Sequence, residues 1–121
     1  MSERDMLTEE QYNFIADGCE DMELDAIWDY FSVPFGSKFM PHRLDSFESR
    51  REGFLWVVGR LLQEGRIVLL DQSTRTPLPG DSLSQVELLR RAFPKEDVAM
   101  DGGLWFFSQS CPGGAAWNAQ R

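Results

Sequence analysis

Cys111 and His42 are the side chains of this sequence best suited to covalent catalysis. A cysteine becomes an effective nucleophile when a base such as histidine lies within hydrogen-bond reach, as in hydrolysis or acyl transfer. His42 is the only histidine and lies far from Cys111 along the chain, so nothing in the spacing requires the two to meet. We therefore predict a protein that is not an enzyme and that has no catalytic residue. A small enzyme that uses Cys111 or His42 is kept as an alternative.

The sequence patterns that bind phosphate, zinc or calcium are absent. The glycine-rich stretch at 112–114 is followed by neither a helix nor a lysine, as a phosphate-binding loop would require. Cysteine and histidine do not occur at the short spacing of zinc ligands. The acids between residues 17 and 29 do not follow the ligand order of an EF-hand, and they are typical of a solvated face. We expect no cofactor and no metal.

Charge is the compositional property that says most about possible partners. The 121 residues carry a net charge of −8 and are 42% hydrophobic, a composition typical of a globular protein. Residues 1–32 hold ten of the twenty acids and one of the twelve bases, whereas residues 33–121 are close to neutral. Phosphate binding requires a basic surface, so we expect no nucleic acid and no anionic membrane as a partner. Complementary charge favours a basic protein partner, although acids also serve solubility alone.

Neither a secretion signal nor a membrane span is predicted. The first ten residues, MSERDMLTEE, are charged from the third onward, unlike the apolar centre of a signal peptide. No apolar run approaches the roughly 18 residues that a transmembrane helix needs. The two cysteines, Cys19 and Cys111, do not form the disulfide framework of a small secreted protein. We expect a cytoplasmic protein that folds as a single domain over residues 1–121.

Two helices are predicted in the acidic N-terminal part of the chain. Thr8 and Gln11 have the spacing of a capping box, and Gly18 is a helix stop, which together predict the first helix. The second helix is predicted over about 22–31. Its buried stripe comprises Leu24, Ile27, Trp28 and Phe31.

A longer third helix is predicted from Asp45, which has capping-box spacing to Glu48, as far as Gly65. Its apolar face comprises Phe47, Phe54, Leu55, Val58, Leu61 and Leu62. Trp56 points almost opposite that face and lies between Gly53 and Gly59. We favour the interpretation that another part of the chain packs closely there, the alternative being a groove for a partner.

The C-terminal half is predicted to supply the sheet. A β run at 66–70 is followed by a fourth helix, capped by Ser82 with Gln85 and ended by Pro94. Two further strands, at 104–110 and 115–118, are predicted to form a hairpin with Cys111 at its corner. Because these elements are grouped rather than alternating, we predict an α+β fold. It has about four helices packed on a small antiparallel sheet of about three strands that ends in a C-terminal hairpin.

Five residues are predicted to bind a protein partner. Asp21, Asp25 and Asp29 are spaced by four, so they lie on one flank of the region of the second predicted helix, and like charges at this spacing are mildly destabilising. Their carboxylates would attract a basic partner over a distance. Phe39, in the proline-bounded connection 33–44, and Trp56 are the candidate aromatic anchors of the interface.

Three blocks of sequence together carry a family resemblance. They are LDAIWDY at 24–30, EGFLWVVGRLLQEGRIVL at 52–69, and LWFF at 104–107 followed by CPGGAAW at 111–117. In these blocks the chain resembles a family of small acidic bacterial proteins known only as a domain of unknown function. Members often occur near genes for adhesin-toxins, which implies immunity proteins that neutralise a cognate toxin, with no catalytic residue and no cofactor. The chain departs from the family pattern before the last tryptophan, where Gly-Ala-Ala predicts a shorter or weaker final strand.

We therefore expect a non-enzymatic, cytoplasmic immunity protein that neutralises a secreted or contact-dependent toxin through an acidic surface. A homo-oligomeric structural or adaptor protein, such as a homodimer formed through an uncovered sheet face, is the second alternative.

Overall fold

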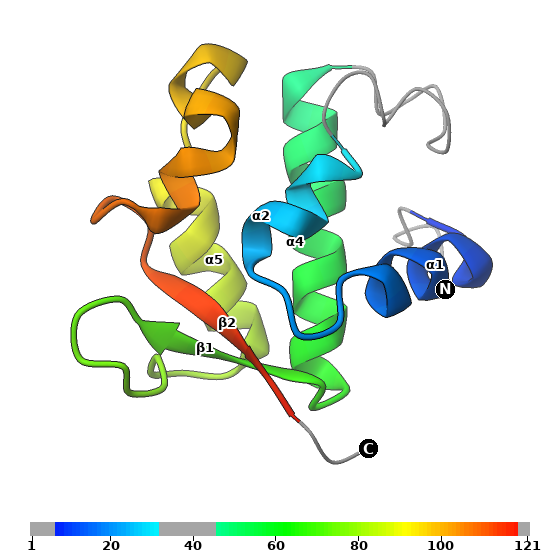
Figure 1. Cartoon of the computed structure of the whole chain (residues 1–121), viewed down its shortest axis with the longest axis horizontal. Helices are drawn as coiled ribbons and strands as arrows, with labels where there is room; N and C mark the ends of the chain where they lie inside the picture. Colours follow the sequence, from blue (N-terminus) through cyan, green and yellow to red (C-terminus); the bar gives the residue numbers. More distant parts are fainter. Residues whose placement is uncertain (1–6, 32–45, 119–121) are drawn as a thin grey trace.

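The computed structural model describes residues 7–31 and 46–118, which form five helices and a two-stranded antiparallel sheet (Figure 1). The mixed α+β class is as predicted, whereas the sheet has two strands instead of three. The longest helix, α4 (Phe47–Gln63), stands at the centre, with α1 (Glu9–Gly18) at one side and α5 (Ser82–Ala92) at the other. The short helix α2 (Leu24–Asp29) lies against α4.

The start of α1 is confirmed. The Thr8 hydroxyl accepts a hydrogen bond from the Gln11 backbone N–H at 3.1 Å, and the Gln11 side-chain oxygen accepts one from the Thr8 N–H at 2.9 Å. Helix α2 is shorter than the predicted 22–31. Asp21 has a φ of 68°, a left-handed conformation that breaks the chain direction just before this helix.

The caps of α4 and α5 each lie one residue from their predicted positions. Ser46 caps α4, because its hydroxyl accepts from the Ser49 N–H at 3.0 Å, so the predicted Asp45–Glu48 box does not begin this helix. Asp45 itself lies outside the described residues. A capping side chain accepts from the N–H of the second or third residue inside the helix, so the cap is the residue directly before the first helical one.

At α5 the cap is Asp81 rather than Ser82, since the Asp81 carboxylate accepts from the Ser84 N–H at 2.9 Å. Gln85 serves a different purpose from the predicted one. Its side-chain amide donates to the carbonyls of Leu78 and Gly80, which fixes the loop before the helix.

The predicted C-terminal hairpin is wrong, because the two strands of the sheet come from distant parts of the chain. Strand β1 (Ile67–Asp71) pairs in antiparallel register with β2 (Gly113–Trp117), so that Ile67 lies opposite Trp117. The last strand therefore begins at Gly113, within the stretch predicted as the turn. Cys111 lies in the loop before β2 and is not a hairpin corner.

The stretch predicted as a strand at 104–110 belongs largely to η3 (Asp97–Phe107), a pair of 3₁₀ helices. Asp101, Gly102 and Gly103 have φ values of 52°, 63° and 99°, and these left-handed residues form the kink between the two helices. After the kink, neighbouring Trp105 and Phe106 are both buried, whereas Leu104 and Phe107 are exposed. That period of three fits a 3₁₀ helix and not the alternation of a strand.

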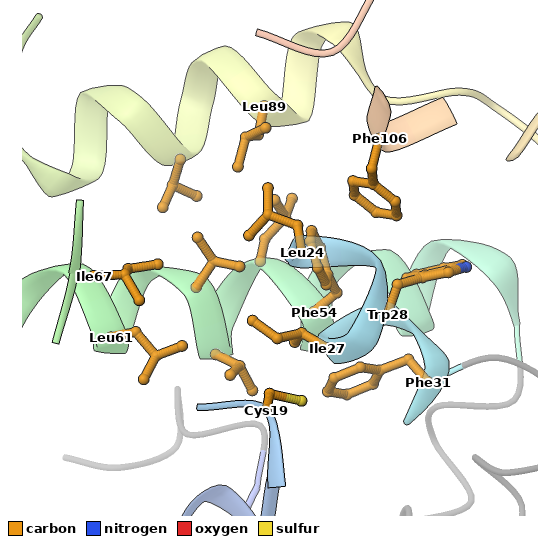
Figure 2. Packing of buried hydrophobic residues seen from close by; sticks show 14 of the residues in the cluster. Cys19, Leu24, Ile27, Trp28, Phe31, Phe54, Leu61, Ile67, Leu89 and Phe106 are labelled. Carbon is orange, nitrogen blue, oxygen red and sulfur yellow. The ribbon is translucent and has the colours of Figure 1, made fainter. Parts of the chain in front are cut away.

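The core joins every element around a group of aromatic rings (Figure 2). The predicted buried stripe of α2 is confirmed, since Leu24, Ile27, Trp28 and Phe31 are at most 3% exposed. Their side chains point toward residues of α4 and α5, among them Phe54 and Leu89 (Figure 2). The inner side of α2 is therefore fixed, and its other side faces outward.

The two glycines that begin β2 offer a paired test of the sheet. A Cβ at Gly113 would lie 2.7 Å from the Leu70 carbonyl oxygen, a backbone atom that cannot move alone. A Cβ at Gly114 would lie 3.2 Å from the Glu23 carboxylate, which ends a flexible side chain. We expect Gly113→Ala to lower the free energy of unfolding by about 2 kcal/mol. Gly114→Ala should change it by no more than about 0.5 kcal/mol.

Urea unfolding followed by tryptophan fluorescence measures both variants. Equal losses of stability in the two variants would contradict the close packing of β2 on β1.

Candidate functional site

Two of the five predicted partner-binding residues share the outer side of α2. Asp25 and Asp29 lie one helical turn apart; Asp29 is exposed and Asp25 is half-buried. Asp21 is also exposed, but it has left-handed backbone and precedes the helix; the role of the three aspartates in binding a partner stays a prediction. A left-handed conformation favours asparagine, aspartate or glycine, so the backbone at position 21 is itself a reason for an aspartate there.

The acidity of the N-terminal part is neutralised unevenly. On α1, the Glu9 carboxylate lies 2.6 Å from the Arg60 guanidinium, and Asp17 lies 3.5 Å from that of Arg66. Asp21, Glu23 and Asp25 form no ion pair with any residue in the described ranges. Within those ranges, charge without an ion pair is therefore concentrated at Asp21, Glu23 and Asp25. Together with Asp29 of the same helix, these residues form what we call the acidic segment.

The two carboxylates of α2 act on their surroundings. Partial burial raises the pKa of Asp29, and the neighbouring Asp25 charge raises it further. The two carboxylates also contribute, after burial, to the raised pKa of the Cys19 thiol. The negative potential of these two carboxylates therefore reaches the buried Cys19, where α1 meets α2.

A largely apolar groove of about 410 Å³ lies at that contact. Two of its side chains are unusually exposed for their size: Phe14 is 52% exposed and Met22 is 50% exposed. The Phe14 ring meets the Tyr30 ring edge to face, with centroids 5.8 Å apart. We call it the α1–α2 groove; its lining is Phe14, Gly18, Cys19, Met22, Ala26, Asp29 and Tyr30.

Gly18 sets how closely the two walls of this groove approach. A Cβ at position 18 would lie only 2.6 Å from the Tyr30 hydroxyl. The residue that sequence reasoning identified as a helix stop thus also makes room for Tyr30. Sequence reasoning did not identify the groove, although Phe14 lies off the buried stripe of α1, which consists of Tyr12, Ile15 and Ala16.

Trp56 lines a second groove, of about 700 Å³, on the outer side of α4. Tyr12 of α1 packs against this tryptophan with ring centroids 5.9 Å apart, which agrees with the favoured interpretation, while its role in binding a partner stays a prediction. Gly59 faces α5 instead, where a Cβ would lie 3.3 Å from Val86. Phe39, the other predicted anchor, lies outside the described residues.

The charges around the Trp56 groove compensate one another. Arg60 pairs with Glu9 and Glu64, and its guanidinium lies 4.1 Å from the centroid of the Tyr12 ring. On the opposite wall, Arg90 pairs with Glu52 at 2.8 Å. This groove therefore lacks the surplus of one charge that distinguishes the acidic segment.

Both cysteine thiols are buried. Burial raises the pKa of Cys111 to about 11 and that of Cys19 to about 12. The Cys111 thiol donates a weak hydrogen bond to the Gly113 carbonyl at 3.4 Å. A thiol of this kind is almost entirely protonated at neutral pH, whereas nucleophilic catalysis requires the thiolate. His42 lies outside the described residues.

Within residues 7–31 and 46–118, no three His, Cys, Asp or Glu side chains converge as metal ligands. Among the helices of those same ranges, none is long and apolar enough to cross a membrane.

Comparison with known proteins finds two likenesses. Residues 62–120 match the model of a family described as "Protein of unknown function, DUF596". In structure, the chain is similar to an uncharacterized protein conserved in bacteria, from Neisseria meningitidis. That similarity has a TM-score of 0.67 and 21% sequence identity, and it covers 93% of this chain and 80% of the other. No curated protein matches the chain in sequence.

These likenesses bear out part of the predicted resemblance. A family of unknown function matches the C-terminal part, and the Neisseria protein shares the fold. The expected connection with toxins stays a prediction.

The rate of thiol alkylation tests whether Cys19 and Cys111 are unreactive in the folded protein. At pH 7 we expect iodoacetamide to modify Cys19 and Cys111 in the folded protein on the order of a hundredfold more slowly than in a peptide, because little thiolate is present. In urea, both should react at the peptide rate. Mass spectrometry over time measures the modification at each site. Rapid modification of folded Cys111, abolished by Cys111→Ser, would support the alternative of a thiol enzyme.

Proposed function

We propose that this protein is a non-enzymatic immunity protein, which binds a secreted or contact-dependent toxin in the cytoplasm and neutralises it through the acidic segment. One observation carries the proposal: the outward carboxylates of α2 have large exposed apolar side chains on both flanks. Phe14 and Met22 lie on the α1 flank, and Leu104 lies on the η3 flank.

The η3 flank is close to the carboxylates. The backbone at Gly103 packs against α2, since a Cβ there would lie 3.6 Å from the Asp25 Cβ. The next residue, Leu104, is 62% exposed, and Phe107 is 55% exposed. Residues three apart in a 3₁₀ helix share one side, so these two side chains form one apolar patch beside Asp25.

This arrangement has the composition of a protein interface. Interfaces combine an apolar centre, whose few large side chains supply most of the binding energy, with charged groups that select and orient the partner. Leu104, Phe107, Phe14 and Met22 can serve as the anchors that Phe39 and Trp56 were predicted to provide. Because the inner side of α2 is fixed in the core, little conformational entropy is lost when its outer side binds.

The expected partner is a basic toxin domain. Toxins that cleave nucleic acid have this character, since a cleft that binds phosphate must be positively charged. Carboxylates placed in such a cleft would occupy the positions of phosphates. The family resemblance, with its connection to adhesin-toxin genes, supports the same choice of partner.

Charge reversal on α2 tests the proposal. We expect the double variant Asp25→Lys/Asp29→Lys to associate about tenfold more slowly with a purified toxin domain encoded by a neighbouring gene, measured at low salt, since steering depends on local charge. Asp21 is left unchanged because lysine disfavours its left-handed backbone. Stopped-flow or surface plasmon resonance gives the rates.

The matched control is Glu48→Lys/Glu96→Lys, which changes the net charge equally on α4 and at the start of η3. We expect a smaller effect from the control, and the two variants should converge at about 1 M salt, where the screening length is about 3 Å. Equal effects of the two variants would contradict steering by the acidic segment. If no neighbouring toxin domain binds the protein, and none is inhibited by it, the proposed function is wrong.

A further inference from the structure

We propose that the apolar patch of Leu104 and Phe107, together with the carboxylates of Glu23 and Asp25, receives a segment of the partner in which large apolar side chains stand next to lysine or arginine. This inference rests on the proposed function, and it names the kind of sequence by which the basic partner is recognised. The patch offers apolar surface that a partner can cover, and the carboxylates offer charge with which a basic neighbour can pair.

The apolar patch lies on the turn of η3 that follows its kink. Leu104 is 62% exposed and Phe107 is 55% exposed, whereas Trp105 and Phe106 between them are buried. The buried rings hold this turn on the core, since the Trp105 ring packs on that of Phe93 with centroids 5.1 Å apart. Large apolar side chains on a fixed turn gain from being covered, because they lose contact with water at a small cost in backbone entropy.

The first carboxylate, that of Asp25, borders the patch at Leu104. Gly103, the residue before Leu104, is buried against α2, and a Cβ there would lie 3.6 Å from the Asp25 Cβ. The start of α2 and the second turn of η3 are therefore in close contact. A basic side chain that pairs with Asp25 lies within reach of the Leu104 side chain.

The second carboxylate, that of Glu23, borders the patch at Phe107 by way of Gln72. A Cβ at Gly114 would lie 3.2 Å from a Glu23 carboxylate oxygen and 3.8 Å from the Gln72 side-chain oxygen, so these two side chains meet there. The Gln72 amide group donates to the Phe106 carbonyl at 2.8 Å, which connects this point to the residue before Phe107. Glu23 itself is exposed and makes no side-chain hydrogen bond to the start of α2.

Both carboxylates are available to pair with a partner. Within residues 7–31 and 46–118, neither Glu23 nor Asp25 forms an ion pair. At the Trp56 groove, by contrast, an incoming cation would compete with Arg60 and Arg90 for carboxylates that these arginines already hold. Apolar surface and unpaired negative charge thus coincide where η3 meets α2, and they favour a partner segment that is both apolar and basic.

Short peptides test this surface without any toxin. The probe is acetyl-Lys-Leu-Phe-Lys amide, which is added over a millimolar range to the ¹⁵N-labelled full chain while backbone amide shifts are followed by NMR. We expect saturable shifts at residues 23–26 and 103–107. Two control peptides separate charge from apolar contact: acetyl-Lys-Gly-Ser-Lys amide keeps the charge, and acetyl-Gln-Leu-Phe-Gln amide keeps the apolar side chains. Each control should bind at least about fivefold more weakly than the probe.

Matched variants then assign the contacts. Phe107→Ser shortens an exposed side chain and should weaken binding of the probe about fivefold. Its control is Val98→Ser, at an exposed apolar residue of η3 before the kink, which should leave binding unchanged. The double variant Glu23→Gln/Asp25→Asn removes two charges at nearly constant shape, and it should weaken binding of the probe but not of the glutamine control peptide.

Equal binding of the probe and either control peptide, or equal effects of Phe107→Ser and Val98→Ser, would overturn the inference. So would saturable shifts centred on the Trp56 groove.

The outcome is separable from that of the proposed function. With a toxin domain, Phe107→Ser should mainly raise the dissociation rate, whereas charge reversal on α2 should mainly lower the association rate. If the probe fails to bind here but charge reversal still slows toxin association, only the recognised segment is wrongly assigned. If the probe binds as expected but no toxin domain associates, the proposed function fails while the surface stands as a site for apolar and basic segments.

Discussion

The position of α2 on the core depends on the packing of the Trp28 side chain. Its ring meets Phe47 and Phe54 of α4 at centroid distances of 5.8 Å, and Phe93 at the end of α5 at 5.5 Å. Helix α2 has only six residues, too few to be stable alone in water. Each large side chain that it buries contributes about 1.5–3 kcal/mol, so the core and not the helix itself keeps α2 in place. The two carboxylates of α2 are consequently held in place by the buried side chains on the other side of the helix.

A buried arginine, Arg50, lies beside the Trp28 ring. Arg50 is 5% exposed and forms two hydrogen bonds to Asp97, at 2.7 and 3.3 Å, while its guanidinium lies 6.0 Å from the centroid of the Trp28 ring. A buried cation is tolerated only when it is paired, so Asp97 fixes the start of η3 on α4. Beyond the kink, Phe106 ties the apolar patch of Leu104 and Phe107 to α4, because its ring lies 5.3 Å from that of Phe54. The carboxylates of α2 and the apolar patch beside them are thus both supported by α4.

Sequence reasoning succeeded where a local pattern decides the structure. The Thr8 cap and the buried stripe of α2 depend on residues within one or two turns, and the structure has both. It failed at 104–107, because a run of apolar residues suits a strand or a buried 3₁₀ turn equally well. The glycines at 102 and 103 decided that choice by adopting left-handed backbone. The pairing of β1 with β2 was also missed, since nothing local marks contacts between residues so far apart in the chain. For the candidate site, the spacing of Asp25 and Asp29 predicted their shared flank, whereas the α1–α2 groove depends on how two helices meet.

Partial burial of Asp29, together with the neighbouring Asp25 charge, links the outer side of α2 to the proton concentration of its surroundings. A carboxyl group whose pKa is raised, like that of Asp29, holds its proton at a pH where an ordinary aspartate has already lost it. A cation beside that group favours the ionised form and lowers the pKa again. In mildly acidic solution, binding a cation at Asp29 would therefore release protons, and the measured heat of association would depend on the buffer that takes them up. By the same linkage, protons and a basic partner compete for the Asp29 carboxylate.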